Sequence, residues 1–201
     1  MIRPAAAVAL LVALCGCGSG PAGSSETPYD FSFDDPPADT VEAVENPDQV
    51  KGIDLVRMSG RVDTEVLRIV LEFAEPISRW TDGAANALDG FIYIDIDQSP
   101  ETGRRSSTQL TGGDFYVDLR DNGSGKVGLV GVVGRTLVLV PAKFEGTRFE
   151  VEIKRSDIST QADADDRMNL AVDISARNRT PVVDFAPNEG VATLEPPPDT
   201  P

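Results

Sequence analysis

Short stretches of alternating apolar and polar residues are the feature that most limits what this chain can fold into. Successive side chains of a β-strand point to opposite faces, so period-two alternation indicates strands with one buried face. No long stretch has the periodicity of a helix. The sequence therefore predicts an all-β fold, an antiparallel β-sandwich of about eight or nine strands within residues 49–195. The alternating or apolar segments are 67–73, 91–97, 113–120, 127–133, 136–140, 149–153 and 168–174.

Turn-forming residues separate several of these segments. Gly134-Arg135 stands between two apolar segments and predicts a tight hairpin. Residues 121–125, Asp-Asn-Gly-Ser-Gly, predict a second turn. Turns at such short intervals favour antiparallel neighbours, because parallel strands need longer crossover connections.

The N-terminal segment has the pattern of a bacterial lipoprotein signal. Arg3 precedes an apolar run over residues 5–14, too short for a bilayer span of about 20 residues. The run ends in LCGCG, which resembles a lipobox: a small residue precedes Cys17, and an aliphatic one stands three positions before it. The resemblance implies that residues 1–16 are a signal peptide and that Cys17 carries a lipid. The alternative is an ordinary secretory signal whose two cysteines form a disulfide or have no role.

Residues 17–48 predict an acidic, proline-rich tether between the lipid and the folded domain. They contain eight Asp or Glu residues, five prolines and no Lys or Arg. Charge of one sign and frequent proline favour an extended, disordered chain. Tyr29, Phe31 and Phe33 alternate with polar residues and would also fit a short docking strand, but we expect a spacer with incidental aromatics. Residues 196–201 predict a second, proline-rich disordered tail.

The absence of histidine and the acidic balance exclude several functions. The 201 residues carry a formal net charge of −15 and include no histidine. Ser-His-Asp and Cys-His catalytic systems, histidine bases and histidine metal ligands are therefore excluded. Nucleic acid is not expected as a partner, because phosphate binding needs a basic surface. No carboxylate pair is marked as catalytic, so we expect a protein that is not an enzyme.

Two stretches of the predicted domain resemble a known group of bacterial domains. Residues 90–103, GFIYIDIDQSPETG, are followed by GDFY at 113–116. They resemble the Asp-x-Asp, turn and Thr-Gly signature of DOMON-like and family 9 carbohydrate-binding-module-like domains. Residues 183–190, VDFAPNEG, are similar to the stretch that often closes such domains. The resemblance covers roughly residues 49–195 and implies a jelly-roll-like sandwich that serves as an extracellular binding or accessory module.

Four aspartates form a candidate calcium site. Asp95 and Asp97 share one face of a predicted strand, and Asp114 and Asp118 share the corresponding face of the next. If these strands pair, three or four carboxylates converge near the 98–112 connection, where hard oxygen ligands would suit Ca²⁺. The alternative is a solvated strand face with turn-capping aspartates too far apart to share an ion.

Aromatic residues on the same faces form a candidate ligand site. Tyr93 and Tyr116 share the faces of these aspartates, and Trp80 follows an earlier strand. Tyrosines beside carboxylates could stack on sugar rings and bind their hydroxyls. The alternative for all three aromatics is packing.

Together these features predict a lipoprotein held outside the cytoplasm, at the cell membrane or the outer membrane. We expect a non-catalytic binding or accessory module, with carbohydrate as the candidate ligand and calcium as the candidate ion. The alternative is a structural envelope protein that binds another protein through an exposed strand edge or the Tyr29–Phe33 segment.

Overall fold

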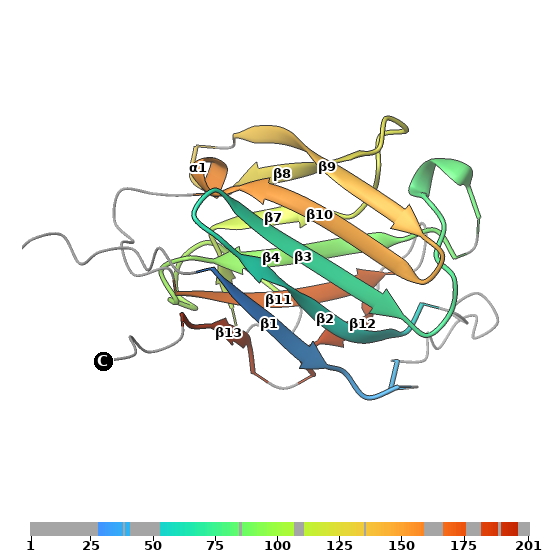
Figure 1. Cartoon of the computed structure of the whole chain (residues 1–201), viewed down its shortest axis with the longest axis horizontal. Helices are drawn as coiled ribbons and strands as arrows, with labels where there is room; N and C mark the ends of the chain where they lie inside the picture. Colours follow the sequence, from blue (N-terminus) through green and yellow to red (C-terminus); the bar gives the residue numbers. More distant parts are fainter. Residues whose placement is uncertain are drawn as a thin grey trace, which may run out of the picture.

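The described residues form thirteen β-strands and two short helical turns (Figure 1). Residues 1–16, Cys17 and residues 197–201 lie outside the described part, so the predicted signal peptide, lipidation site and most of the tail do too. This computed structural model describes residues 28–37, 39–40, 53–84, 86–106, 111–134, 136–158, 167–175, 182–188 and 190–196. The elements are β1 (Tyr29–Asp34), β2 (Leu55–Val62), β3 (Val66–Phe73), the 3-10 turn η2 (Trp80–Asp82), β4 (Asp89–Asp95), β5 (Arg104–Arg105), β6 (Gly112–Gly113), β7 (Phe115–Asp118), β8 (Lys126–Gly131), β9 (Leu137–Glu145), β10 (Arg148–Lys154), α1 (Arg155–Ile158), β11 (Met168–Ser175), β12 (Val182–Ala186) and β13 (Ala192–Leu194).

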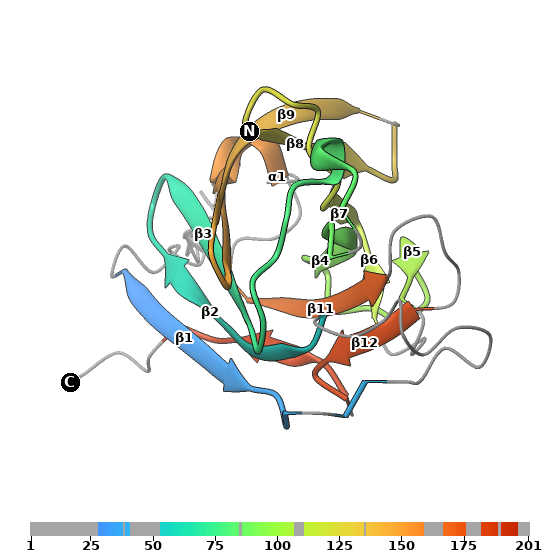
Figure 2. The same ribbon diagram turned by 90° about the vertical axis from the view of Figure 1, so that its right-hand side faces the viewer.

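One large antiparallel sheet contains eleven of these strands. Its order is β1-β2-β3-β10-β9-β8-β7-β4-β11-β12, with β13 pairing with β11 outside that path. The sheet curls on itself, so β3, β10 and β9 lie in front of β4, β7 and β11 in Figure 1, and Figure 2 shows the curl from the side. β5 and β6 pair separately. The all-β antiparallel fold predicted from the sequence is confirmed.

The core lies between the two layers of the curled sheet. Leu67, Ile69 and Leu71 on β3, and Ile92 and Ile94 on β4, are fully buried. These residues occupy alternate positions, so the period-two pattern decides which face of each strand the core covers. Burying one such side chain stabilises the fold by about 1.5–3 kcal/mol.

β1 lies inside the range that the sequence assigned to the tether. It pairs antiparallel with β2, with Phe31 opposite Gly60. Tyr29, Phe31 and Phe33 all pack against the core. A Cβ at residue 60 would come within 2.6 Å of Phe31 Cζ, so glycine leaves the space that this ring occupies. The folded part therefore begins at Tyr29 rather than after residue 48. Tyr29–Phe33 form a strand, as in the alternative interpretation, and not the spacer that we expected.

Two of the acidic residues that suggested a tether, Asp30 and Asp34, pair with arginines on the outer face of β1 and β2. Asp30 lies 3.0 Å from Arg61, and Asp34 lies 3.5 Å from Arg57, both on β2. The charges of these two residues are thus matched by the neighbouring strand. Composition does not reveal these pairs, because the arginines lie 31 and 23 positions further along the chain.

The sheet closes where β12, the last strand of its order, contacts β2, the strand next to β1 at the other end. Leu55, the first residue of β2, donates its backbone N–H to Asp184 Oδ2 on β12 at 2.6 Å. Asp184 is 1% exposed, and its other oxygen accepts the N–H of Phe185. One buried carboxylate therefore joins the N-terminal and C-terminal parts of the domain.

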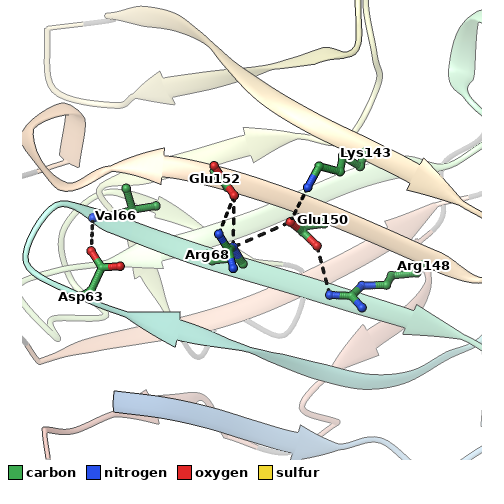
Figure 3. A network of polar contacts seen from close by, with 7 residues as sticks. All are labelled: Asp63, Val66, Arg68, Lys143, Arg148, Glu150 and Glu152. Carbon is green, nitrogen blue, oxygen red and sulfur yellow. Dashed lines mark hydrogen bonds and ion pairs between the residues drawn. The ribbon is translucent and has the colours of Figure 1, made fainter. Parts of the chain in front are cut away.

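The outer face of β3, β10 and β9 carries a balanced ionic network (Figure 3). Glu150 lies 3.0 Å from Lys143, 3.0 Å from Arg148 and 3.7 Å from Arg68. The hydrogen bond from Lys143 is the main cause that lowers the pKa of Glu150. At the β2–β3 hairpin, Asp63 accepts the N–H of Val66, and its backbone hydrogen bonds lower its pKa. The acidic and basic side chains of this network pair with one another.

Candidate functional site

Three of the four aspartates predicted to converge do so at the end of β4. Asp95 ends β4, Asp97 follows two residues later, and Asp114 immediately precedes β7. β4 and β7 pair antiparallel with Ile94 opposite Phe115, so the start of β7 lies beside the end of β4. A carboxylate oxygen of each of the three lies within 4.8 Å of the others. We name Asp95, Asp97 and Asp114 the first aspartate cluster; its members are close enough to share an ion.

Asp118 does not belong to this cluster, contrary to the prediction. In the antiparallel register it lies opposite Phe91, four residues from Asp95 along β4, which is about 13 Å. Its carboxylate accepts hydrogen bonds from the Arg120 guanidinium at 2.8 and 2.6 Å. The alternating pattern predicts that Asp114 and Asp118 share one face, but it does not predict which end of β7 lies beside Asp95.

Asp95 is fully buried and well supplied with donors. Its Oδ1 accepts the N–H of Ser99 at 3.2 Å, and its Oδ2 accepts from the Thr111 hydroxyl at 3.2 Å and the Asn169 amide at 3.4 Å. Burial is the main cause that raises the pKa of Asp95. The carboxylate thus organises the 98–111 connection from inside.

The other two members cap turns at the same end of the sheet. Asp97 accepts the N–H of Ser99 at 2.9 Å and the hydroxyl of Thr102 at 2.9 Å. Asp114 Oδ2 accepts the N–H of Ile96 at 3.0 Å. Asp97 and Asp114 therefore cap turns, as the alternative interpretation of the sequence proposed. Calcium binding at this cluster stays a prediction.

The two predicted tyrosines lie opposite each other on β4 and β7 but differ in exposure. Tyr93 is 3% exposed, and its hydroxyl hydrogen-bonds Asp173 and Arg104. Burial is the main cause that raises the pKa of Tyr93. Tyr116 is half-buried. Tyr93 is thus a packing residue that holds Arg104, and Tyr116 is the tyrosine that a ligand could touch.

Arg104 covers the aromatic rings of this face. Its guanidinium carbon lies 4.4 Å from the ring centre of Phe91 and 4.6 Å from that of Tyr116. The two rings meet edge to face with centres 5.4 Å apart. We name Phe91, Arg104 and Tyr116 the Arg104 surface. Sequence reasoning put Phe91 on the right face but did not select Arg104, because only the pairing of β5 with β6 brings it there.

Trp80 lies apart from these rings, beside the second arginine of the region. Arg120 lies 5.9 Å from the Trp80 ring centre and pairs with Asp118 and Asp89 at 2.6 and 3.6 Å. Burial is the main cause that raises the pKa of Asp89. Trp80 lies in η2 and is half-buried. The surface beside it therefore consists of a partly exposed indole ring and of Arg120, whose charge is balanced by Asp118 and Asp89.

A second acidic group was not anticipated from the sequence. Asp35 directly follows β1, Asp39 lies four residues later, and Asp184 lies on β12. One carboxylate oxygen of each lies within 4.8 Å of the others. We name these three the second aspartate cluster. Asp184 stands in the closing stretch 183–190 that the resemblance picked out, but Asp35 lay in the expected tether.

The β8–β9 hairpin carries the large apolar side chains that are most exposed in the described part of the chain. Val133 is 85% exposed, Leu137 63% and Leu139 47%. β8 and β9 pair as a hairpin, and Gly131 donates its N–H to the Thr136 carbonyl at 2.8 Å, whereas Arg135 of the predicted turn lies outside the described residues. An apolar group at a hairpin tip is a feature of contact surfaces.

Comparisons with protein-family models, with curated proteins and with solved structures found no match to this chain. Among the described residues, none of the helices has the length and apolar character needed to cross a membrane.

Proposed function

We propose that this chain is a non-catalytic binding module of the bacterial cell envelope, anchored by a lipid on Cys17, and that its ligand is a carbohydrate. The observation that carries the proposal is the Arg104 surface, where a guanidinium lies over two aromatic rings on the outside of the sheet. The all-β fold agrees with the class that the DOMON-like resemblance implies.

The chemistry of the Arg104 surface suits sugar hydroxyls. Phe91 and Tyr116 are both partly exposed, and the part of each ring that Arg104 leaves open offers apolar surface to the C–H groups of a sugar. Arginine offers several N–H donors in a fixed plane. Among the described residues, no carboxylate lies within ion-pair distance of Arg104, whereas Arg120 is held by Asp118 and Asp89. Arg104 therefore keeps donors that a ligand can use.

The anchoring part of the proposal is carried by the lipobox-like residues before Cys17. β1 starts twelve positions after Cys17. Because a fully extended chain advances about 3.5 Å per residue, the sheet would stand at most about 40 Å from the lipid. This is a shorter reach than a tether extending to residue 48 would give, and it favours ligands close to the envelope surface.

The test is a glycan array with the full chain, followed by calorimetry with the sugars retained. We expect Arg104→Ala and Tyr116→Ala to weaken binding about 5- to 100-fold, the range of one lost stacking or charged hydrogen-bond contact. Arg79→Ala is the matched control, since Arg79 also lies over an aromatic ring, Phe144, at 5.7 Å. Equal losses in all three variants, or retention of no glycan, would contradict the proposal.

A protein-binding envelope domain is the second candidate, and the exposed β8–β9 hairpin favours it. The Tyr29–Phe33 segment no longer supports this alternative, because its aromatic side chains pack against the core of its own domain. Cross-linking in envelope preparations should capture a partner that Leu137→Asp releases and Arg104→Ala keeps. Capture that is insensitive to Leu137→Asp would remove this candidate.

A further inference from the structure

The second aspartate cluster gathers acidic groups from distant parts of the chain at one place. Asp35 and Asp39 lie at the N-terminal side of the domain, and Asp184 lies about 150 positions later on β12. Asp54, just before β2, is close enough for its charge to affect both Asp35 and Asp184. Four carboxylates thus surround the point where the two ends of the curled sheet meet.

Two oxygens of this cluster are buried without a hydrogen-bond partner among the described residues: Asp35 Oδ2 and Asp39 Oδ1. Asp35 is 5% exposed, and its other oxygen accepts from the Asn188 amide at 3.4 Å. Asn188 also donates to Asp39 Oδ2. Buried carboxylate oxygens without donors are rare in folded proteins, because a buried polar atom without a hydrogen bond is strongly unfavourable. These two oxygens therefore point to a ligand that supplies positive charge.

No basic side chain of the described part pairs with the cluster. The charges that act on Asp35 come from Asp184, Asp39 and Asp54, all of the same sign. Burial, followed by these charges, raises the pKa of Asp35 to about 7, and burial is also the main cause that raises the pKa of Asp184 to about 7. By contrast, Glu150 has three basic partners within 4 Å. A cation would supply the balance that the side chains of this cluster lack.

The spacing and chemistry of the donors fit calcium. Two oxygens that bind one Ca²⁺ at about 2.4 Å lie at most about 4.8 Å apart, and the three aspartates meet this limit. All of the donors are oxygen, which calcium prefers, and the site has no sulfur or imidazole group for a transition metal. Turning the Asn188 amide would add a fourth oxygen ligand.

We propose that Asp35, Asp39 and Asp184 bind one calcium ion that fastens β1 and the residues after it to β12. The ion replaces mutual repulsion with attraction at the closure of the sheet. Calcium then controls how firmly the N-terminal strand is docked. The site is separate from the Arg104 surface, so this proposal does not depend on the carbohydrate ligand.

The test uses the full chain, calorimetric titration with CaCl₂ and thermal melting in CaCl₂ or in chelator. We expect calcium at 100 times its dissociation constant to favour the folded state about 100-fold and to raise the melting temperature. Asp35→Asn should lose one bound calcium and most of the calcium-dependent shift. Asp34→Asn, a matched change at an exposed aspartate of β1 that lies in neither aspartate cluster, should keep both.

Two further results make the outcome decisive. Asp39→Asn, at a less buried position, should also lose the ion, and it serves if Asp35→Asn does not fold. In chelator, trypsin should cut wild type between β1 and β2 at least tenfold faster than in calcium, and Asp39→Asn should be cut at one rate in both. An unchanged melting temperature of wild type in calcium, or calcium binding retained by Asp39→Asn and Asp35→Asn, would overturn the proposal.

Discussion

Glu150 and Asp184 are carboxylates on strands of one sheet, but their surroundings are opposite. Glu150 has a side chain 13% exposed and lies within 4 Å of Arg68, Lys143 and Arg148 (Figure 3). Asp184 is 1% exposed, and the charges near it are those of other aspartates. The pKa of Glu150 is lowered, whereas that of Asp184 is raised to about 7.

The contrast identifies the part of the fold whose charges are not balanced by its own side chains. Around Glu150 the strands supply both signs of charge, so ionisation is favourable at neutral pH. Around Asp184 they supply one sign, so these carboxylates need either a proton or a bound cation from solution. The charges of the network on the outer face therefore balance one another. The stability of the sheet closure should instead depend on pH and on the calcium concentration.

The largest effect should come from Asp184→Ala. The change removes the acceptor of the buried Leu55 N–H at 2.6 Å and of the Phe185 N–H at 2.9 Å. Two hydrogen bonds to a charged group lost at a buried position predict a fall of about 2–4 kcal/mol in the free energy of unfolding. Urea unfolding measures this fall.

Asp184→Asn is the control for that prediction. It keeps one side-chain oxygen for the Leu55 N–H while it removes the charge. We expect a smaller fall than for alanine, in chelator, because the repulsion from Asp35 and Asp39 is relieved. Equal destabilisation by both variants would show that the hydrogen bond from the Leu55 N–H, which asparagine can keep, is not what the fold requires of Asp184.

The second effect concerns pH, measured in chelator on wild type and Asp35→Asn. The folded pKa of Asp35 is about 7, above its ordinary value of 3.8, so the folded state holds the proton more tightly than the unfolded state. This contribution to stability is full below about pH 4 and is lost as the pH rises through 7. Asp35→Asn lacks it.

The stability difference between the two proteins should therefore change with pH in one direction. Between pH 4.5 and 7.5 the variant should gain on the order of 2 kcal/mol relative to wild type, less than a full three-unit shift gives, because Asp39 beside it is partly open to solvent. Parallel stability curves for the two proteins would mean that Asp35 is not perturbed. Calcium should flatten the wild-type curve, since the ion keeps the carboxylate ionised.

The sequence predicted the individual strands of the sheet and their buried faces, but not the contact between β12 and β2 that closes the sheet. Alternation identified β4, β7 and their buried faces, and hence Asp95, Asp97 and Asp114, because these residues are brought together by neighbouring strands. The prediction that Asp118 joins this cluster was wrong, because alternation does not specify the register in which β7 pairs with β4. The second aspartate cluster could not be predicted, because Asp35 and Asp184 meet only when the sheet curls until β12 contacts β2. β1 was not predicted as part of the domain, because the prolines and acidic residues around it are typical of a disordered segment, and the arginines that pair with Asp30 and Asp34 lie on β2.

The smallest effect should come from Glu150→Gln, on the balanced side of the comparison. The partners of Glu150 are about half exposed, at 47%, 48% and 61%, and exposed ion pairs contribute about 0.2–1 kcal/mol each. Glutamine keeps one acceptor, so we expect a loss of about 0.5–1 kcal/mol at pH 7 that shrinks in 1 M NaCl, where charges are screened beyond about 3 Å. Because the pKa of Glu150 is lowered in the folded state, its contribution is present above its ordinary pKa and lost as the pH falls through the lowered value. The two proteins should therefore become equally stable in acid, the reverse of the Asp35 result. A larger loss that salt does not change would mean that the Glu150 network, too, supports the fold from a buried position, and the contrast with Asp184 would fail.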